Sequence, residues 1–179
     1  MTNSTTVRVF IGVGSNVDPA ANLQLAISVL AQRYPALQLS SVYRNPPVGF
    51  AGDDFLNMVV AFSTAECLAE VAAVLEDIHR RVGRVSGEQK FGPRKLDLDL
   101  LLYGCQVDAG ARVPRADVLR YAFVLGPMAE IAPSLRHPVT GDTMHDAWSA
   151  YSGAQALKNL GQVQDLGGTV VTGATGEVV

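Results

Sequence analysis

The chain has 179 residues, of which 48% are hydrophobic and 17% charged, with a formal net charge of −3. This length fits one domain with at most an appendage, and the composition is apolar enough to form a core. The acidic balance excludes a generally basic, nucleic-acid-binding chain. No leader-like N-terminus and no run near the roughly 18 apolar residues of a membrane helix are found. We therefore expect a cytoplasmic protein that binds neither nucleic acid nor membrane.

Cysteine and histidine spacing gives no evidence of a metal site. Cys67 and Cys105 lie far apart and match no paired ligand spacing. His137 and His145 have no partner at metal-ligand spacing either. We expect both cysteines to be buried, reduced thiols and both histidines to be surface or packing residues.

The first half of the chain alternates strand and helix patterns. Residues 7–13 are rich in β-branched and aromatic side chains and predict a buried strand that stops at Gly12 and Gly14. Asp18 and Pro19 then predict a helix start, and apolar residues recur at helical spacing until Pro35. Residues 39–44 and 55–64 predict two further strands, separated by a loop of Pro, Gly and Asp.

A second helix is predicted over 68–82. Ser63 and Glu66 have the spacing of a capping box, and apolar residues step by three and four until Gly83. A polar loop over 84–90 precedes a fourth strand over 96–103. The order β-α-β-β-α-β predicts an α+β, ferredoxin-like antiparallel sheet with both helices on one face.

The remaining residues add to this plan. We expect short helices over 116–119 and 124–131, so that residues 1–150 form the domain. Residues 151–179 are expected to be a C-terminal extension, with 169–179 forming a hairpin or remaining loose.

Two aspartates in the fourth strand carry the first chemical signal. Strand alternation places Asp97 and Asp99 on one face, about 6.6 Å apart along the strand, and leucines on the other. Two carboxylates at this distance repel each other, which disfavours the ionised form of one of them unless a cation lies nearby. Mg²⁺ commonly binds through one or two carboxylates plus substrate phosphates, so the pair predicts a nucleotide triphosphate site. The alternative is that both aspartates form the solvent face of an amphipathic strand.

Nearby basic residues favour the first interpretation. Arg84 and Lys90 lie on the preceding loop, and Arg94 lies just before the strand. Magnesium beside carboxylates with several arginines is suited to moving a phosphoryl or pyrophosphoryl group.

Several separated motifs, in order over roughly residues 7–140, carry a family resemblance. They are IGVGSN at 11–16, SSVYRNPPVG at 40–49, DFLN at 54–57, GR at 83–84, KFGPRKLDLDLLLYG at 90–104, VPRADVL at 113–119, AFVLGP at 122–127 and EIAP at 130–133. This pattern resembles the 6-hydroxymethyl-7,8-dihydropterin pyrophosphokinases. The resemblance implies transfer of pyrophosphate from ATP to a reduced pterin alcohol in folate biosynthesis, by a monomer or weak homodimer.

The resemblance also implies roles for individual residues. Asp97 and Asp99 would bind two Mg²⁺ ions that bridge the ATP phosphates. Arg84 and Arg94 would be catalytic phosphate contacts, on a mobile loop that also carries Phe91. Further implied ATP contacts are Leu100 and Arg115. The implied pterin pocket consists of Asn45, Pro46, Val48, Phe55, Asn57 and Phe123, with the two aromatic rings enclosing the flat bicycle.

The chain departs from the family pattern mainly on the ATP side. It has His79 where a Glu is usual, Ser86 and Tyr121 where Arg is usual, and Arg115-Ala116 where a His-Tyr pair is usual. On the pterin side Phe55 replaces a common tyrosine. Arg115 or Arg120 could supply lost phosphate contacts, because guanidinium pairs bidentately with phosphate. The alternative function is a paralogue that binds pterin as a binding or regulatory module with weak transfer. A ferredoxin-like platform for nucleic acid or protein is disfavoured by the acidic balance.

Overall fold

The computed structural model describes residues 6–82 and 95–166. An antiparallel sheet runs in the order β5-β1-β4-β3-β6, and β2 also pairs with β4. The strands are β1 (Val7–Ser15), β2 (Gln38–Leu39), β3 (Tyr43–Asn45), β4 (Phe55–Thr64), β5 (Asp97–Tyr103) and β6 (Lys158–Asn159). The long antiparallel pair β1 and β4, in register from Val7↔Thr64 to Ser15↔Leu56, forms its centre.

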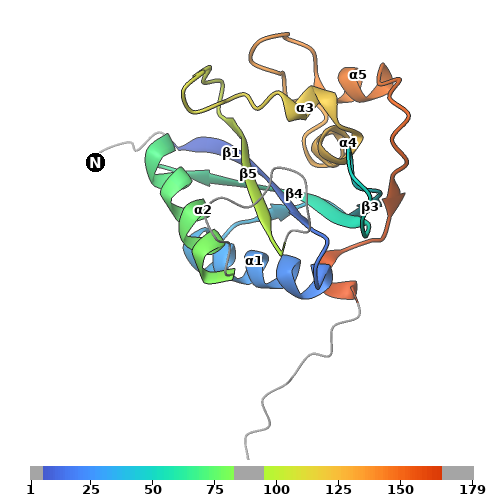
Figure 1. Cartoon of the computed structure of the whole chain (residues 1–179). Coiled ribbons are helices and arrows are strands. Elements are labelled where there is room, and N and C mark those ends of the chain that lie inside the picture. The colour runs from blue at the N-terminus through green and yellow to red at the C-terminus, as the bar shows by residue number, and fades with distance from the viewer. Residues whose placement is uncertain (1–5, 83–94, 167–179) are drawn as a thin grey trace, which may run out of the picture.

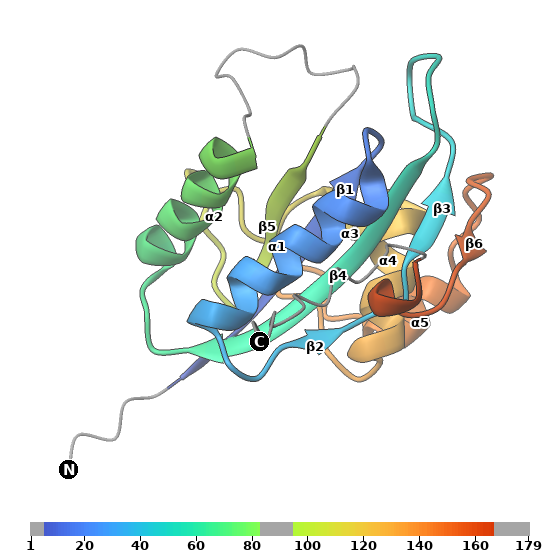
Figure 2. The same cartoon turned by 90° about the horizontal axis from the view of Figure 1, so that it is seen from below.

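Helices cover the two faces of the sheet differently (Figures 1 and 2). On one face lie α1 (Pro19–Arg33) and α2 (Leu68–Val82), whose apolar residues form one core cluster with those of β1 and β4. On the other lie α3 (Asp117–Arg120), α4 (Ala122–Ile131) and α5 (Met144–Ser149), which enclose a second cluster. The predicted α+β, ferredoxin-like plan with both long helices on one face is thus confirmed. None of the helices in the described ranges is long and apolar enough to span a bilayer.

The prediction that β1 stops at its glycines is wrong. β1 continues through Gly12 and Gly14 to Ser15, paired with β4 on one side and β5 on the other. Of the two, only Gly14 is required by close packing, because the Asn57 side chain occupies the space of a Cβ there. A Cβ at Gly12 would lie 3.5 Å from a methyl group of Leu101, and one at Gly14 would lie 2.4 Å from Oδ1 of Asn57.

The start of α2 also differs from the prediction. Ser63 belongs to β4, and Glu66 accepts hydrogen bonds from Arg33 and Tyr34 instead of capping the helix. Glu70 performs that function, because its carboxylate accepts a hydrogen bond of 2.6 Å from the backbone N–H of Cys67. This cap lies at the surface, so Cys67 is exposed, as is Cys105 after β5; the expectation that both thiols are buried is wrong.

Residues 151–166 lie against the sheet and α4. The predicted strand over 39–44 is divided into β2 and β3. Between them Oγ of Ser40 accepts a 2.9 Å hydrogen bond from the N–H of Val59, and Val42 exchanges backbone hydrogen bonds of 2.8 Å with Leu160 and Gly161. Earlier in the 151–166 segment, Oε1 of Gln155 accepts a 2.8 Å hydrogen bond from the N–H of Ala122, the first residue of α4. Residues 169–179, predicted to form a hairpin or remain loose, lie outside the described part of the chain.

We predict that Gln155→Ala lowers the free energy of unfolding by about 1 kcal/mol. The substitution removes the side chain that satisfies an N–H group at the N-terminus of α4, and a typical hydrogen bond contributes this much. Urea denaturation followed by circular dichroism measures the change as a lower midpoint at unchanged slope. Gln106→Ala, at an exposed site after β5, is the matched control and should unfold like the wild type. Equal midpoints for the two variants would show that this cap contributes nothing.

Candidate active site

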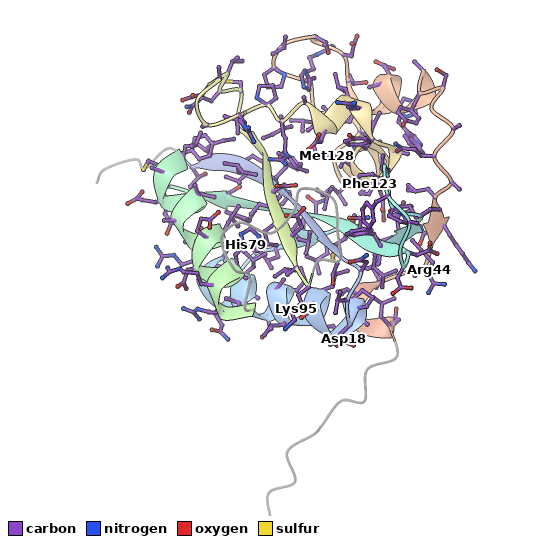
Figure 3. All side chains as sticks on the ribbon, viewed as in Figure 1. Asp18, Arg44, His79, Lys95, Phe123 and Met128 are labelled. Atoms are coloured by element: carbon purple, nitrogen blue, oxygen red, sulfur yellow. The ribbon has the colours of Figure 1, made fainter. Side chains whose placement is uncertain are left out.

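One cavity of about 1120 Å³ lies over the end of the sheet where β1, β4 and β5 meet. Its walls come from the β3–β4 region, from α2, and from the segment that leads from β5 into α3 and α4. Figure 3 shows two of the lining residues, His79 on α2 and Phe123 on α4, on opposite sides of β5 in that view. The cavity therefore brings together side chains that are far apart in the sequence.

Asp97 and Asp99 both line this cavity. Leu98 between them points to the opposite face and belongs to the core under α1 and α2, as the alternation predicts. The alternation ends after Leu100, where a register irregularity opposite Phe10 and Ile11 places Leu101 and Leu102 together in the second core cluster. The two carboxylates thus project on the same side of β5. They line a cavity and do not form the fully exposed face of an amphipathic strand.

The carboxylate pair fits Mg²⁺ as a ligand set. Carboxylate oxygens are hard ligands, and Mg²⁺ usually takes one or two of them together with water and substrate phosphates. Within residues 6–82 and 95–166, no group of three or more His, Cys, Asp and Glu side chains could hold a metal ion by itself. A Mg²⁺ ion bound here would take its remaining ligands from water or from a phosphate group.

His79 fixes the backbone between the two aspartates. Its imidazole is 3% exposed, and Nε2 accepts a 2.9 Å hydrogen bond from the N–H of Leu98. This N–H points away from β1, and β5 is the last described strand on this side of the sheet. The N–H therefore has no neighbouring strand to bond and needs another partner, which His79 provides. Nδ1 lies 3.7 Å from Oε1 of Glu76. The residue that replaces the usual Glu is therefore a backbone acceptor that holds β5 in place.

Arg115 lies directly against the carboxylate pair. Its Nη2 is 3.0 Å from Oδ1 of Asp99, and its Nε donates a 2.6 Å hydrogen bond to Oδ2 of Asp117. Burial opposes the guanidinium charge, but Asp99, Asp117 and Asp97 outweigh it and raise the pKa of Arg115 above its usual value. Arg112 and Arg120 line the same cavity, as do Glu76 and Asp117, so its lining carries charges of both signs.

Two amides meet at the other end of the cavity. Nδ2 of Asn57 donates a 2.7 Å hydrogen bond to Oδ1 of Asn45, whose own Nδ2 donates to the carbonyl of Pro46 at 3.0 Å. These bonds fix the orientation of the Asn57 amide, and its Oδ1 occupies the space where Gly14 has no side chain. The orientation of the Asn57 amide is thus fixed by contacts within the protein.

Each predicted sandwich ring has an aromatic neighbour. Phe55 packs edge-on against Phe50, with ring centroids 6.2 Å apart. Phe123 stacks on Tyr121 at 5.0 Å, and the guanidinium of Arg120 lies 5.3 Å from the centroid of the Tyr121 ring. All five residues line the cavity. Tyr121, which replaces a usual Arg, therefore supports the Phe123 ring.

The remaining predicted site residues are placed as follows. Val48 lines the cavity and is 39% exposed, whereas Pro46 is exposed and is not among the lining residues of the described chain. Leu100 packs its side chain against the α1–α2 core, away from the two aspartates. Arg84 and Arg94, like Ser86 and Phe91, lie outside the described residues.

Sequence reasoning missed Gly14, Phe50 and Asp117 as site residues. Asp117 could have been found from its spacing to Arg115, because both flank the start of a predicted helix. Phe50 could have been found as the aromatic residue nearest to the predicted pterin loop. Gly14 had no such signal, because its role depends on the register between β1 and β4.

We predict that Gly14→Ala weakens pterin binding at least about tenfold with little effect on ATP binding. The new Cβ would lie 2.4 Å from Oδ1 of Asn57, so the amide must rotate and give up its bond to Asn45. Fluorescence titration with the pterin measures the loss. Gly12→Ala, whose Cβ would make an ordinary 3.5 Å contact with Leu101, is the matched control and should bind within about twofold of the wild type.

A double-mutant cycle tests the cause of this loss. If Gly14→Ala acts through Asn57, combining it with Asn57→Ala should be no worse than Asn57→Ala alone. Additive losses would contradict that explanation.

Comparison with known proteins identifies the family of this chain. The model of the family "7,8-dihydro-6-hydroxymethylpterin-pyrophosphokinase" matches residues 10–133. A 2-amino-4-hydroxy-6-hydroxymethyldihydropteridine pyrophosphokinase of Methylorubrum extorquens is 40% identical over 147 residues, covering 78% of this chain and 90% of the relative. The enzyme of that name from Pseudomonas aeruginosa is 37% identical over 141 residues, covering 73% and 84%.

Solved structures show the same fold. The crystal structure of wild-type Plasmodium falciparum HPPK-DHPS matches with a TM-score of 0.61 at 10% sequence identity, covering 81% of this chain. This chain spans only 44% of that longer protein. At such low identity the likeness concerns the fold alone. On the family match and the close relatives, the chain belongs to the 7,8-dihydro-6-hydroxymethylpterin-pyrophosphokinase family.

Proposed function

We propose that this protein transfers a pyrophosphoryl group from ATP to 6-hydroxymethyl-7,8-dihydropterin through the cavity described above. Its family consists of ATP-dependent pyrophosphokinases of folate biosynthesis. The observation that carries the proposal is that one cavity is lined by both kinds of group that this reaction needs. The amide of Asn57 and the rings of Phe55 and Phe123 form one part of the lining, and Asp97 and Asp99 form another.

The amide and aromatic residues would bind the pterin. A flat heterocycle is held well between aromatic faces, with a few directed hydrogen bonds that set its orientation. Phe55 and Phe123 would supply the faces, while Asn57, fixed by Asn45, would bond the ring edge. Pro46 and Val48 would contribute from the loop between β3 and β4. This binding mode would place the pterin in the same cavity as the two carboxylates.

Asp97 and Asp99 would hold two Mg²⁺ ions together with the ATP phosphates. When bound, Mg²⁺ neutralises charge on the phosphate oxygens and fixes the triphosphate for in-line attack. Arg115 from the described part of the cavity, and Arg84 and Arg94 from the loop before β5, would pair with phosphate oxygens as charge moves during transfer. The backbone at Leu100 would complete the ATP contacts.

The proposed reaction forms one oxygen–phosphorus bond and breaks another. The hydroxyl oxygen of the pterin alcohol attacks the β-phosphorus of ATP, and the bond from that phosphorus to the bridging oxygen of the α-phosphate breaks. AMP leaves, the hydroxyl proton is released, and the pterin diphosphate forms. We expect this reaction to occur in the cytoplasm, where ATP is available, and in a monomer or weak homodimer.

Incubation with ATP, Mg²⁺ and 6-hydroxymethyl-7,8-dihydropterin tests the proposal directly. We expect AMP and the pterin diphosphate in equal amounts, measured by chromatography, and no AMP when the pterin is left out. ADP as the product would contradict pyrophosphoryl transfer. Pterin binding measured by calorimetry without AMP formation would instead support the catalytically weakened paralogue.

We predict that Asp97→Asn and Asp99→Asn each lower kcat at least about a hundredfold. Each change removes a charged oxygen ligand, and metal ions contribute several kcal/mol of charge stabilisation in such reactions. Steady-state AMP formation at saturating Mg²⁺ measures the effect, and circular dichroism checks that the fold is kept. Asp165→Asn, at an exposed carboxylate outside the cavity lining, is the matched control. Activity within about threefold of the wild type in either cavity variant would exclude the metal role of that residue.

A further inference from the structure

Arg115 makes contacts that the pyrophosphoryl transfer itself does not explain. Its two ends are held by different carboxylates, Nη2 by Asp99 at 3.0 Å and Nε by Asp117 at 2.6 Å. The backbone N–H of Arg115 donates a 2.8 Å hydrogen bond to the carbonyl of Leu101 on β5. This bond anchors the start of the Arg115 side chain beside the strand that carries Asp99.

The environment makes both ion pairs significant. The side chains of Arg115, Asp99 and Asp117 are 28%, 29% and 30% exposed, so solvent screens them only in part. Asp97 also raises the pKa of Arg115, which places the guanidinium within the field of both cavity aspartates. A cation at this position offsets the repulsion that two neighbouring carboxylates would otherwise feel.

The oxygen that Arg115 engages belongs to one of the two carboxylates assigned to the metal ions. A divalent ion without its nucleotide must therefore compete with a guanidinium that is already in place. Guanidinium binds phosphate and carboxylate oxygens with the same planar geometry, so the Nη2 end can exchange one partner for the other. Asp117 can retain Nε throughout, which keeps the side chain in the cavity.

We propose that Arg115 is the built-in counter-cation of the carboxylate pair, bound to Asp99 in the empty enzyme and transferred to a phosphate group of the nucleotide when it binds. Asp117 is the positioning residue that holds Arg115 during this exchange. The inference rests on the proposed function, in that Asp99 is a metal ligand. It makes metal and nucleotide binding mutually dependent, because Arg115 leaves Asp99 only when a phosphate can take its place.

The proposal predicts effects of opposite sign on two ligands. In Arg115→Gln, Asp99 loses a cation that competes with the metal, so Mn²⁺ added without nucleotide should bind at least about fivefold more tightly than to the wild type. The same variant should bind α,β-methylene ATP with metal at least about fivefold more weakly, because a phosphate contact is lost. Electron paramagnetic resonance of free Mn²⁺ and calorimetry with the analogue measure these two affinities. A merely structural role of Arg115 would weaken both.

Asp117→Asn provides an independent test with the opposite sign for the metal. With its second partner neutralised, Arg115 would pair more strongly with Asp99, and Mn²⁺ alone should bind about threefold or more weakly than to the wild type. Arg136→Gln is the matched control, because Arg136 is exposed, bonds the carbonyl of Gly141 and does not line the cavity. It should leave both affinities unchanged.

Asp99→Asn separates a failure of this inference from a failure of the proposed function. If Asp99→Asn loses Mn²⁺ binding but Arg115→Gln binds Mn²⁺ no more tightly than the wild type, the counter-cation role alone is overturned. Unchanged Mn²⁺ binding in Asp99→Asn and in Arg115→Gln would overturn both, because Asp99 would then not be a metal ligand. Tighter Mn²⁺ binding in Arg115→Gln that is abolished by adding Asp99→Asn would support both.

Discussion

The register of β5 is the constraint on which the rest of the site depends. Because side chains alternate along a strand, a shift by one residue would bury both aspartates under α1 and α2 and turn the leucines into the cavity. β1 fixes this register on one side, with Gly14 opposite Asp97 and Gly12 opposite Asp99. On the other side His79 accepts the N–H of Leu98. The two carboxylates are thus fixed by a paired strand and a buried imidazole, and not by a loop.

The same pair of strands joins the two parts of the site. Gly14 of β1 pairs with Asp97 of β5 on one side and with Asn57 of β4 on the other. The carboxylates and the Asn57 amide are therefore connected through one residue without a side chain. The segment that contains α3 and α4 then completes the cavity with Arg115, Tyr121 and Phe123. Substrate and nucleotide groups would therefore meet above a rigid sheet, which suits a reaction whose catalysis is mainly positioning and neutralisation of charge.

Local patterns predicted the fold well but did not predict contacts that depend on distant pairing. Helical spacing located α1 and α2, and alternation correctly placed Leu98 opposite Asp97 and Asp99. The capping prediction at Ser63 and Glu66 was wrong because α2 begins only at Leu68, and Glu66 bonds Arg33 and Tyr34 at the end of α1. The ion pair of Arg115 with Asp99 and the cap supplied by Gln155 arise from tertiary packing, which no local pattern contains.

The central claim is that the metal ions and the pterin bind in one cavity, on either side of the transferred group. A crystal structure with Mn²⁺, α,β-methylene ATP and 6-hydroxymethyl-7,8-dihydropterin, with the metal located by anomalous scattering, tests it most directly. We expect anomalous peaks in contact with Asp97 and Asp99, and the pterin ring between Phe55 and Phe123. Metal peaks on other residues, or a pterin bound outside this cavity, would contradict it.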